Sequence, residues 1–283
     1  MAGKPSSLRL IFGRIRRNPI AFLGLLIILG YVGMALFAPV LAPHDPIRQD
    51  LDKSFAPISA EHPLGCDEFG RDILSRILFG ARISLTIQVF SVGIALFVGV
   101  FLGAISGFFG GWIDEGIMRI MDILLAFPGI LLALAIVAML GPDLHNLIIA
   151  IGIYSIPQFA RITRGSVLTV KQNEYVTAAR AIGETKPSVI LRYVLPNAIS
   201  PIIIQTTLRM ATVLLTAAGL GFLGLGVQPP QPEWGTMLST ARMYLRSAPM
   251  VAFFPGVSIM IVVLGFNFFG DGLQDALNPK LKD

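Results

Sequence analysis

Few side chains in this sequence have the type and spacing that chemistry requires. Cys66 is the single cysteine, so no disulfide can form within the chain. The three histidines, His44, His62 and His145, are widely separated in the sequence. His62, Cys66 and Asp67 could together contact one ion, but that spacing is weakly specific, and a turn before a helix is the simpler interpretation. We therefore expect no metal site and no cofactor in this chain.

The sequence also lacks the signatures of an ATPase or of a membrane-embedded enzyme. It contains no G-x-x-x-x-G-K-[ST] loop, which would cradle the phosphates of ATP. No histidine, cysteine or pair of carboxylates lies within the long apolar segments. Nucleophilic or metal-assisted catalysis inside the membrane would need such groups, and we predict that the chain is not an enzyme.

Polar side chains inside apolar segments are the remaining candidates. Arg209 lies about a dozen residues into a long apolar segment, and a charge inside a membrane is by default a functional-site hypothesis. Two structural roles explain Arg209 equally well: an ion pair with another side chain, or an anchor near the inner membrane interface. Gln205 and Asn267 are candidates for the lining of a pathway, although such side chains also link helices. Arg119 and Asp122 are three residues apart, so we expect them to neutralise each other on one helix face.

Composition predicts an all-α membrane protein. Hydrophobic residues make up 54% of the 283 residues and charged residues only 14%, unlike a water-soluble globule of ordinary composition. A helix needs about 20 apolar residues to cross the hydrocarbon layer. Six transmembrane helices are predicted, over residues 19–42, 84–107, 116–140, 147–162, 198–225 and 250–269. The fourth is the weakest, because it is short and contains Pro157.

The distribution of charge predicts the orientation. Basic residues without any acid precede the first span, which places the N-terminus in the cytoplasm; they are Lys4, Arg9, Arg14, Arg16 and Arg17. Six spans return the C-terminus to the same side and make the basic loop 161–196 cytoplasmic. The segment 47–82, assigned to the outside, carries five basic residues but also six acids. No basic face alternates with aromatic residues, so nucleic acid is not an expected partner.

One polar segment between two apolar spans has a distinctive pattern. Residues 174–183 read Glu-Tyr-Val-Thr-Ala-Ala-Arg-Ala-Ile-Gly, and residues 193–196 read Tyr-Val-Leu-Pro. Ala178 and Ala179 give a short helix a small-residue face, and Gly183 can adopt the left-handed conformation that ends a helix. The pattern predicts a helix-turn-helix at the membrane surface, with a shallow face that another protein can approach closely.

This pattern resembles the coupling loop of ABC-importer permeases, which reads Glu-Ala-Ala, three residues, Gly, nine residues, Ile, one residue and Leu-Pro. The matching positions are Ala178, Ala179, Gly183, Leu195 and Pro196. Thr177 stands where the family has Glu, and Tyr193 where it has Ile. The resemblance implies that these residues, with Glu174 and Thr177, contact an ATPase subunit. An ordinary amphipathic cytoplasmic loop is the alternative.

Two further regions resemble the second permease subunit of dipeptide and oligopeptide importers. Residues 62–76 contain Gly-Cys-Asp, Gly-Arg-Asp and Ser-Arg, with Cys66 in place of the family's Thr. The other region includes Pro-Glu-Trp-Gly at 232–235, Phe-Asn-Phe-Phe-Gly-Asp-Gly-Leu at 266–273 and Asn-Pro-Lys at 278–280. Gln274 and Asn278 stand where the family usually has Arg and Asp.

The residue pattern predicts that residues 62–82 form a loop followed by an interfacial helix, which leads into the second span. Its apolar residues recur at the spacing of one helix face. We expect Arg71, Arg76 and Arg82 to reach toward the lipid headgroups.

The resemblance implies a type I ABC-importer permease fold with a cytoplasmic coupling helix, in the cytoplasmic (inner) membrane of a bacterium or archaeon. Residues 1–80 would hold the tail, the first span and an extracytoplasmic segment, and residues 81–283 the five-helix core with coupling loop 161–196. The implied partners are a homologous second permease, two ATPase subunits that bind ATP and Mg, an extracytoplasmic binding protein and membrane lipid. Dipeptides or oligopeptides are the expected substrates, with nickel chelates and glutathione as alternatives.

A secondary transporter or channel is the competing class. It would also explain several spans without an ATP site. Such proteins usually carry buried carboxylates or broken-helix ion sites deep in the membrane, and none is evident in mid-span here. This class would also leave the coupling-loop pattern unexplained.

Overall fold

The structure is a computed structural model in which residues 13–277 are described. This part of the chain is helical and has no β-strand, only an isolated bridge between Cys66 and Asp72. The long helices are α2 (Pro19–Leu41), α3 (Ile73–Phe109), α4 (Gly111–Ala126), α5 (Gly129–Leu140), α6 (Leu144–Val170), α9 (Leu195–Phe222) and α11 (Met250–Leu277). The short elements are η1 (Leu51–Lys53), α7 (Glu174–Ala181), α8 (Lys186–Ser188), η2 (Val189–Val194), α10 (Trp234–Ala241) and η3 (Arg242–Tyr244).

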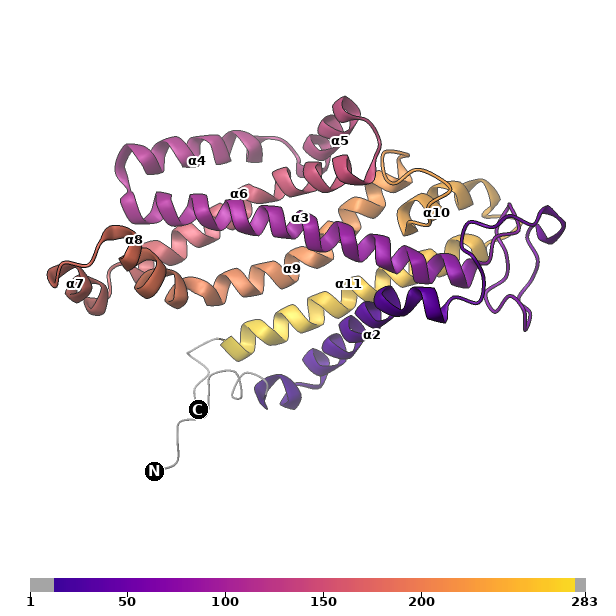
Figure 1. Cartoon of the computed structure of the whole chain (residues 1–283), viewed down its shortest axis with the longest axis horizontal. Helices are drawn as coiled ribbons and strands as arrows, with labels where there is room; N and C mark the ends of the chain where they lie inside the picture. Colours follow the sequence, from indigo (N-terminus) through magenta and orange to yellow (C-terminus); the bar gives the residue numbers. More distant parts are fainter. Residues whose placement is uncertain (1–12, 278–283) are drawn as a thin grey trace.

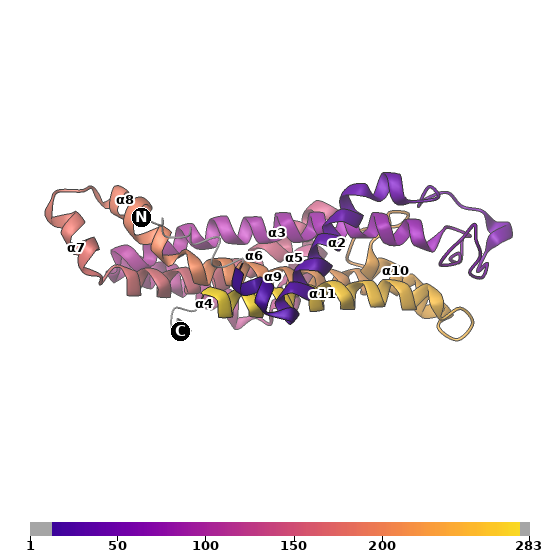
Figure 2. The ribbon, with the colours of Figure 1, turned by 90° about the horizontal axis from the view of Figure 1, so that it is seen from below.

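Most long helices run along the long axis of the molecule. The short helices α7 and α8 lie at one end, and the loop 42–72 lies at the other (Figure 1). Figure 2 shows the same separation of the two ends from below. Helix α2 begins and α11 ends in the half that carries α7 and α8, where the Arg14 Nη1 atom donates a 3.0 Å hydrogen bond to the Ala276 carbonyl. Lys4, Arg9 and residues 278–280 lie outside the described residues.

The described residues contain four helices that are long and apolar enough to cross a membrane. They are α2, α3, the continuous stretch Lys186–Phe222 that ends with α9, and α11. The pair α4–α5 adds a fifth if it is counted as one span. Helix α6 has 27 residues and continues through Pro157, but it carries polar side chains and is not among the four. The count of six spans therefore stays a prediction.

The predicted third span, 116–140, is broken. Helices α4 and α5 meet at 88°, and the break lies at Phe127 and Pro128. Proline has no N–H to donate, and it forces the preceding residue out of the helical region. Phe127 accordingly has φ −91° and ψ 136°. One proline thus converts an apolar run that looks continuous into two helices.

Helices α3 and α6 make the most extensive contact between two elements. Gly99, Gly103 and Gly107 of α3 repeat every fourth residue and face α6. A Cβ atom on Gly99 would lie 2.8 Å from the Ile156 carbonyl oxygen, and one on Gly107 would lie 2.9 Å from the Arg164 carbonyl oxygen. At Gly103 the approach is closer still. The two backbones are therefore packed without intervening side chains, as small residues permit in membrane proteins.

A second cluster joins α2, α3, α9, α10 and α11. The Tyr31 ring centroid lies 5.7 Å from that of Trp234 and 6.4 Å from that of Phe266. The Tyr31 hydroxyl donates to Gln88 Oε1 at 2.7 Å, and Gln88 Nε2 donates to the Met210 carbonyl at 2.9 Å. This chain of hydrogen bonds satisfies the buried polar groups of Tyr31 and Gln88 and links α2, α3 and α9.

The loop 42–72 is held by buried ion pairs, which corrects one prediction. Arg71 and Arg76 do not reach toward lipid headgroups, because both side chains are buried. Arg71 Nε lies 2.7 Å from Asp67 Oδ2, and Arg76 Nη1 donates to the Pro46 carbonyl at 2.9 Å. Only Arg82 remains exposed as expected. Helix α3 also begins at Ile73 rather than after a separate interfacial helix, so residue 80, the predicted domain boundary, lies within it.

We expect Gly103→Val to lower the melting temperature of the detergent-solubilised protein. The added side chain would meet the α6 backbone, and overpacking of this kind costs about 1–3 kcal/mol. Gly93→Val is the matched control, because Gly93 lies on the same helix with nothing within 4 Å of an added Cβ. An unchanged melting temperature for Gly103→Val would contradict the close contact of α3 with α6.

Candidate functional site

Helix α7 ends in a turn built on Gly183. Gly183 has a φ of +88°, in the left-handed region that favours glycine. Its N–H donates to the Arg180 carbonyl at 3.1 Å, and the Glu184 N–H donates to the Ala179 carbonyl at 3.2 Å. These are the two hydrogen bonds of a Schellman motif. The predicted helix with a glycine stop is confirmed, and the space around Gly183 is open.

One face of α7 is packed against the ends of the long helices. Val176 and Ala179 are buried in a cluster that joins α3, α6, η2 and α9. The other buried members are Ala104, Phe108, Val167, Val170, Val189, Val194 and Ala198. Helix α7 is therefore attached to several membrane helices at once, not suspended on a free loop.

Three basic side chains fasten the same segment to the end of α3. The Lys171 ammonium donates to the Gly107 carbonyl at 2.6 Å. The Arg180 guanidinium lies 4.9 Å from the Phe108 ring centroid, and the Lys186 ammonium lies 5.6 Å from that of Phe109. Cations favour both aromatic faces and the negative end of a helix dipole. These contacts add electrostatic attachment to the apolar packing of α7.

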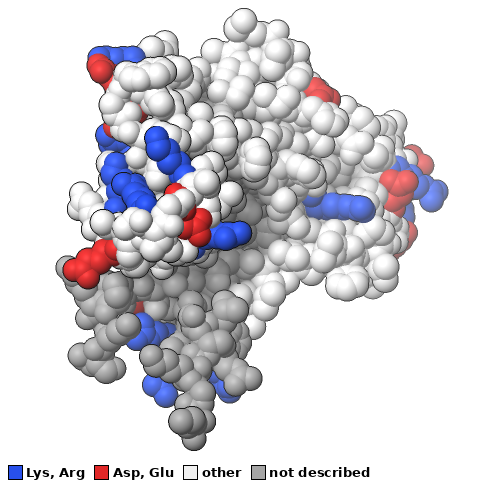
Figure 3. Space-filling model, turned by 60° about the vertical axis from the view of Figure 1, so that its left-hand side comes forward, with Lys and Arg blue, Asp and Glu red and all other residues white. Residues whose placement is uncertain are grey.

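The other face of α7 is open. Of the predicted coupling residues, Ala179 is buried and Leu195 is half-buried, while the rest are exposed: Glu174, Thr177, Ala178, Gly183 and Pro196. Large apolar side chains also face outward here, with Ile182 79% and Leu191 65% exposed. Figure 3 shows lysine and arginine side chains gathered around this end of the molecule. An exposed apolar surface rimmed by charge is typical of a protein-interaction site.

Two ion pairs connect α6 to α4 behind this surface. Arg164 makes two 2.6 Å hydrogen bonds to the Asp114 carboxylate, which is the bidentate geometry that arginine favours. Arg161 Nη2 lies 2.6 Å from Asp122 Oδ1. The prediction that Asp122 would pair with Arg119 is wrong, because its partner comes from the neighbouring helix.

Arg209 is buried between α9 and α6. Its side chain is packed inside the helix bundle, with a residue exposure of 5%. The guanidinium Nη2 and Nε atoms lie 3.1 and 3.3 Å from Ser155 Oγ, and the guanidinium carbon lies 4.6 Å from the Tyr154 ring centroid. No ion pair within the described residues includes Arg209. Its burial does not fit an anchor at the lipid interface, and its partners are a hydroxyl and an aromatic face.

The other predicted pathway residues are half-buried. Gln205 lies one helical turn before Arg209 on α9, and Asn267 lies on α11, which packs against α9. The hydrogen bonds of residues 13–277 link neither side chain to Arg209. Sequence reasoning missed Gln88, Tyr31 and Ser155, which make the buried polar contacts in this region. A lone glutamine in an apolar helix was the available signal for Gln88.

The Pro-Glu-Trp-Gly motif at 232–235 has a structural role in this fold. Glu233 caps α10, since its carboxylate accepts hydrogen bonds from the N–H groups of Gly235 at 2.8 Å and Thr236 at 2.7 Å. Trp234 is fully buried, and its indole N–H donates to the Ile77 carbonyl at 3.1 Å. The motif thus fixes α10 against α3.

Cys66 is buried in the loop 42–72. Burial, with Asp72 and Asp67 nearby, raises the pKa of its thiol to about 11. Burial also raises the pKa of Glu68, whose Oε2 atom has no hydrogen-bond partner within the described residues. A neutral buried thiol is a poor nucleophile, so the geometry gives Cys66 a packing role.

Two known protein families match separate parts of this chain. Residues 99–283 match the family described as binding-protein-dependent transport system inner membrane component. Residues 6–57 match the N-terminal transmembrane domain of oligopeptide transport permease C.

Individual relatives match almost the whole chain. The dipeptide transport system permease protein DppC of Alkalihalophilus pseudofirmus is 50% identical over 96% of this chain and 89% of its own length. The di/tripeptide transport system permease protein DppC of Pseudomonas aeruginosa is 49% identical over 99% of this chain and 94% of its own length. The glutathione transport system permease protein GsiD of Pectobacterium atrosepticum is 46% identical over 95% of this chain and 90% of its own length.

A solved structure has the same fold. The inward-facing MetNI methionine ABC transporter matches with a TM-score of 0.59 and 18% identity, over 73% of this chain and 98% of the matched chain. The class defined by this helical fold is the membrane permease of an ABC importer. The chain belongs to the binding-protein-dependent transport family of inner-membrane components. It is a multi-pass permease subunit, not an enzyme, and its class works with ATPase subunits and a binding protein.

The raised pKa of Cys66 predicts slow reaction with thiol reagents. At pH 8 a thiol with a pKa of about 11 has on the order of 100-fold less thiolate than an exposed cysteine of ordinary pKa. We expect a maleimide to label native Cys66 at least that much more slowly than Ser59→Cys in a Cys66→Ser background, since Ser59 is exposed. Equal labelling rates would contradict the buried, neutral state of Cys66.

Proposed function

We propose that this chain is one of two non-identical permease subunits of an ABC importer that carries dipeptides and short oligopeptides. The observation that carries the proposal is α7, a helix fixed to three long helices on one face and open on the other. Support for the substrate class comes from the relatives named dipeptide and di/tripeptide permeases. Glutathione is the alternative that a relative's name favours, and nickel chelates remain the other.

The proposed mechanism divides the work between subunits. Two partner ATPases bind ATP and Mg, and an extracytoplasmic binding protein delivers the substrate. The exposed surface of α7, with Glu174, Thr177 and Ala178, docks on one ATPase. Because Ala179 is part of the buried cluster, its role is to hold α7 on the permease. Movement of the ATPase then acts through α7 on α3, α6 and α9, as transmission through packed elements requires.

The proposed translocation path runs beside α9. Its polar groups are Arg209, between α9 and α6, and Gln205 and Asn267, on the packed helices α9 and α11. Arg209 has no carboxylate partner within residues 13–277. Because its side chain is buried here, it would meet the carboxylate of a peptide only if the path opened between α9 and α6. The second permease would line the opposite side of the path.

Both termini and α7 are proposed to lie in the cytoplasm, with the loop 42–72 outside. Figure 1 supports this, since α2 begins and α11 ends in the half of the molecule that carries α7. The basic residues before the first span favour the cytoplasmic side for this end of the molecule. Termini on the same side require an even number of crossings, and six is the proposed count.

We expect Ala178→Asp to abolish transport-coupled ATP hydrolysis while the protein still folds and inserts. Ala178 is exposed, so the change leaves the buried cluster intact but places a charge on the docking surface. Gly183→Val should act similarly, through strain of about 1–2 kcal/mol in the left-handed turn. Ala60→Asp is the matched control, because it makes the same change at an exposed site at the opposite end. Normal uptake by Ala178→Asp would exclude the docking role.

The topology is tested with single cysteines in a Cys66→Ser background. Suitable exposed positions are Ser59, Gln172 and Gln231. An impermeant thiol reagent added to intact cells should label positions 59 and 231, and position 172 only after permeabilisation. Labelling of position 172 from outside would contradict both the orientation and the docking role of α7.

Reconstitution tests the subunit composition and the substrate. The complete set comprises this chain, the second permease, both ATPases and the binding protein in proteoliposomes. Peptide-stimulated ATP hydrolysis and uptake should require all of them, with dipeptide, glutathione and a nickel chelate compared at equal concentration. Full uptake without the second permease would refute the heterodimer, and uptake of glutathione alone would replace the peptide assignment.

A further inference from the structure

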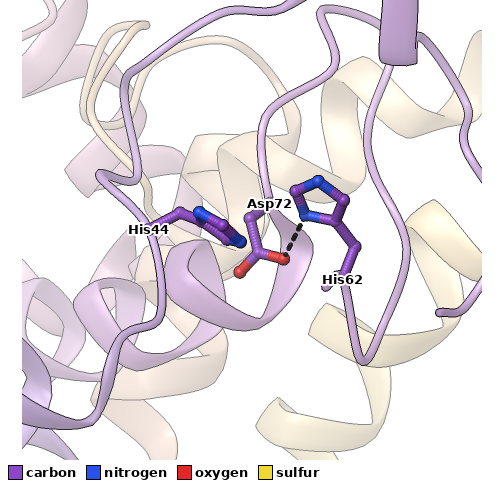
Figure 4. A group of neighbouring side chains, drawn as sticks. All are labelled: His44, His62 and Asp72. Carbon is purple, nitrogen blue, oxygen red and sulfur yellow. Dashed lines mark hydrogen bonds and ion pairs between the residues drawn. The ribbon is translucent and has the colours of Figure 1, made fainter. Parts of the chain in front are cut away.

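Two of the three histidines, far apart in sequence, meet in the loop 42–72. His44 follows α2, His62 lies in the middle of the loop, and Asp72 caps the first turn of α3. Figure 4 shows the Asp72 carboxylate between the two imidazole rings. The ring centroids of His44 and His62 lie 4.6 Å apart, and His62 Nδ1 lies 3.1 Å from Asp72 Oδ1.

The three side chains have the donor set of a transition-metal site. Each offers one nitrogen or carboxylate oxygen, and these three atoms all lie within 4.8 Å of one another. Two imidazoles and a carboxylate suit Zn²⁺, which binds His nitrogen and Asp oxygen at about 2.0–2.2 Å. Small side-chain rotations would bring all three donors to that distance from one ion.

The surrounding hydrogen bonds match those that orient metal ligands. His44 Nε2 lies 2.9 Å from the Glu61 carbonyl oxygen, a contact that holds the orientation of the ring. Asp72 Oδ2 accepts hydrogen bonds from the Ser75 N–H and hydroxyl, both at 2.7 Å, which leaves Oδ1 for an ion. Ligands held in this way by carbonyl and hydroxyl partners are typical of metal centres.

For His62 to bind the ion through Nδ1, its ring proton must lie on Nε2. Its Nδ1 lies 3.1 Å from Asp72 Oδ1, while Nε2 lies 3.4 Å from the Lys53 ammonium and 3.9 Å from Glu61 Oε1. With the ion on Nδ1, the ring proton would lie on Nε2, and the Glu61 carboxylate would have to close from 3.9 Å to accept it. Lys53 is already held by Glu61 at 2.6 Å, on the far side of the ring from the proposed ion.

We propose that His44, His62 and Asp72 form a Zn²⁺ site with two imidazole nitrogens and one carboxylate oxygen. A fourth position would open on the adjoining cavity of ≈ 230 Å³, which is lined by the acids Asp45, Asp50 and Glu61 and by the bases Arg48 and Lys53. The cavity wall thus carries three carboxylates against two cations, besides the proposed ligand Asp72. The bound ion would join the start, middle and end of the loop 42–72. The sequence had suggested no metal, because the histidines are scattered until the chain folds.

Cobalt titration of the full-length protein in detergent tests this site. The protein is purified without a histidine tag and stripped of metal, and Co²⁺ is added as a spectroscopic probe. We expect one Co²⁺ per chain with the visible absorption of a four-coordinate ion, displaced by one equivalent of Zn²⁺. His44→Gln and His62→Gln should each weaken binding at least ~10-fold, the scale on which changes around metal ligands act.

His145→Gln is the control, because this exposed histidine beside Asp143 offers a comparable His–Asp pair outside the proposed site. It should leave Co²⁺ affinity unchanged. Melting temperatures of the metal-free variants identify any that fail to fold, and the half-buried His44 provides a test that does not depend on the more buried His62. Zn²⁺ should raise the melting temperature of the native protein but not of His44→Gln. Absence of saturable binding, or equal loss in His145→Gln, would overturn the proposal.

Discussion

The close contact between the backbones of α3 and α6 is the constraint on which the rest of the molecule depends. Lipid chains are as apolar as leucine, so helices in a membrane gain little from hydrophobic burial and associate through packing and hydrogen bonds. Gly99, Gly103 and Gly107 allow α6 to lie directly against α3. The same pair sets the position of α7, because α7 follows the end of α6 and packs on the end of α3.

This arrangement gives α7 two distinct faces. Val176 and Ala179 pack inward, and Thr177 and Ala178 face outward one residue away. Neighbouring alanines in the family pattern therefore differ physically: Ala179 attaches α7 to the permease, and Ala178 lies on the surface proposed for docking. A charged substitution at Ala179 would detach α7 from its own permease, whereas one at Ala178 would alter only the surface offered to the partner. A charge at Ala179 would therefore test the attachment of α7, and a charge at Ala178 would test the proposed coupling to the ATPase.

The sequence could predict features that depend on local chemistry. The first span ends at 42 in the prediction and at Leu41 in the structure, and the helix stop at Gly183 follows from glycine's access to positive φ. The break at Pro128 was not predicted, although the proline is plain in the sequence. The apolar run around it predicts one span, and the structure has two helices there. The motif at 174–196 identified the surface now seen on α7, because its small residues and glycine are fixed by local geometry.

Features that depend on long-range partners could not be predicted. Asp122 pairs with Arg161 from another helix, and Arg76 binds the Pro46 carbonyl, although sequence spacing favoured Arg119 and lipid headgroups. His44 and His62 come together only when the loop 42–72 closes over the start of α3. In each case the sequence supplied the charged or polar group, but only the fold supplied its partner.

We propose that α7 moves with α3 and α6 as one unit. The most direct measurement is the distance between spin labels at the exposed positions Ile182 on α7 and Phe97 on α3, recorded in the assembled importer with and without ATP. We expect a single narrow distribution of the Ile182–Phe97 distance that does not change with ATP, while the distance from Ile182 to the coupling helix of the second permease does change. A distance from Ile182 to Phe97 that shifts or broadens with ATP would contradict it.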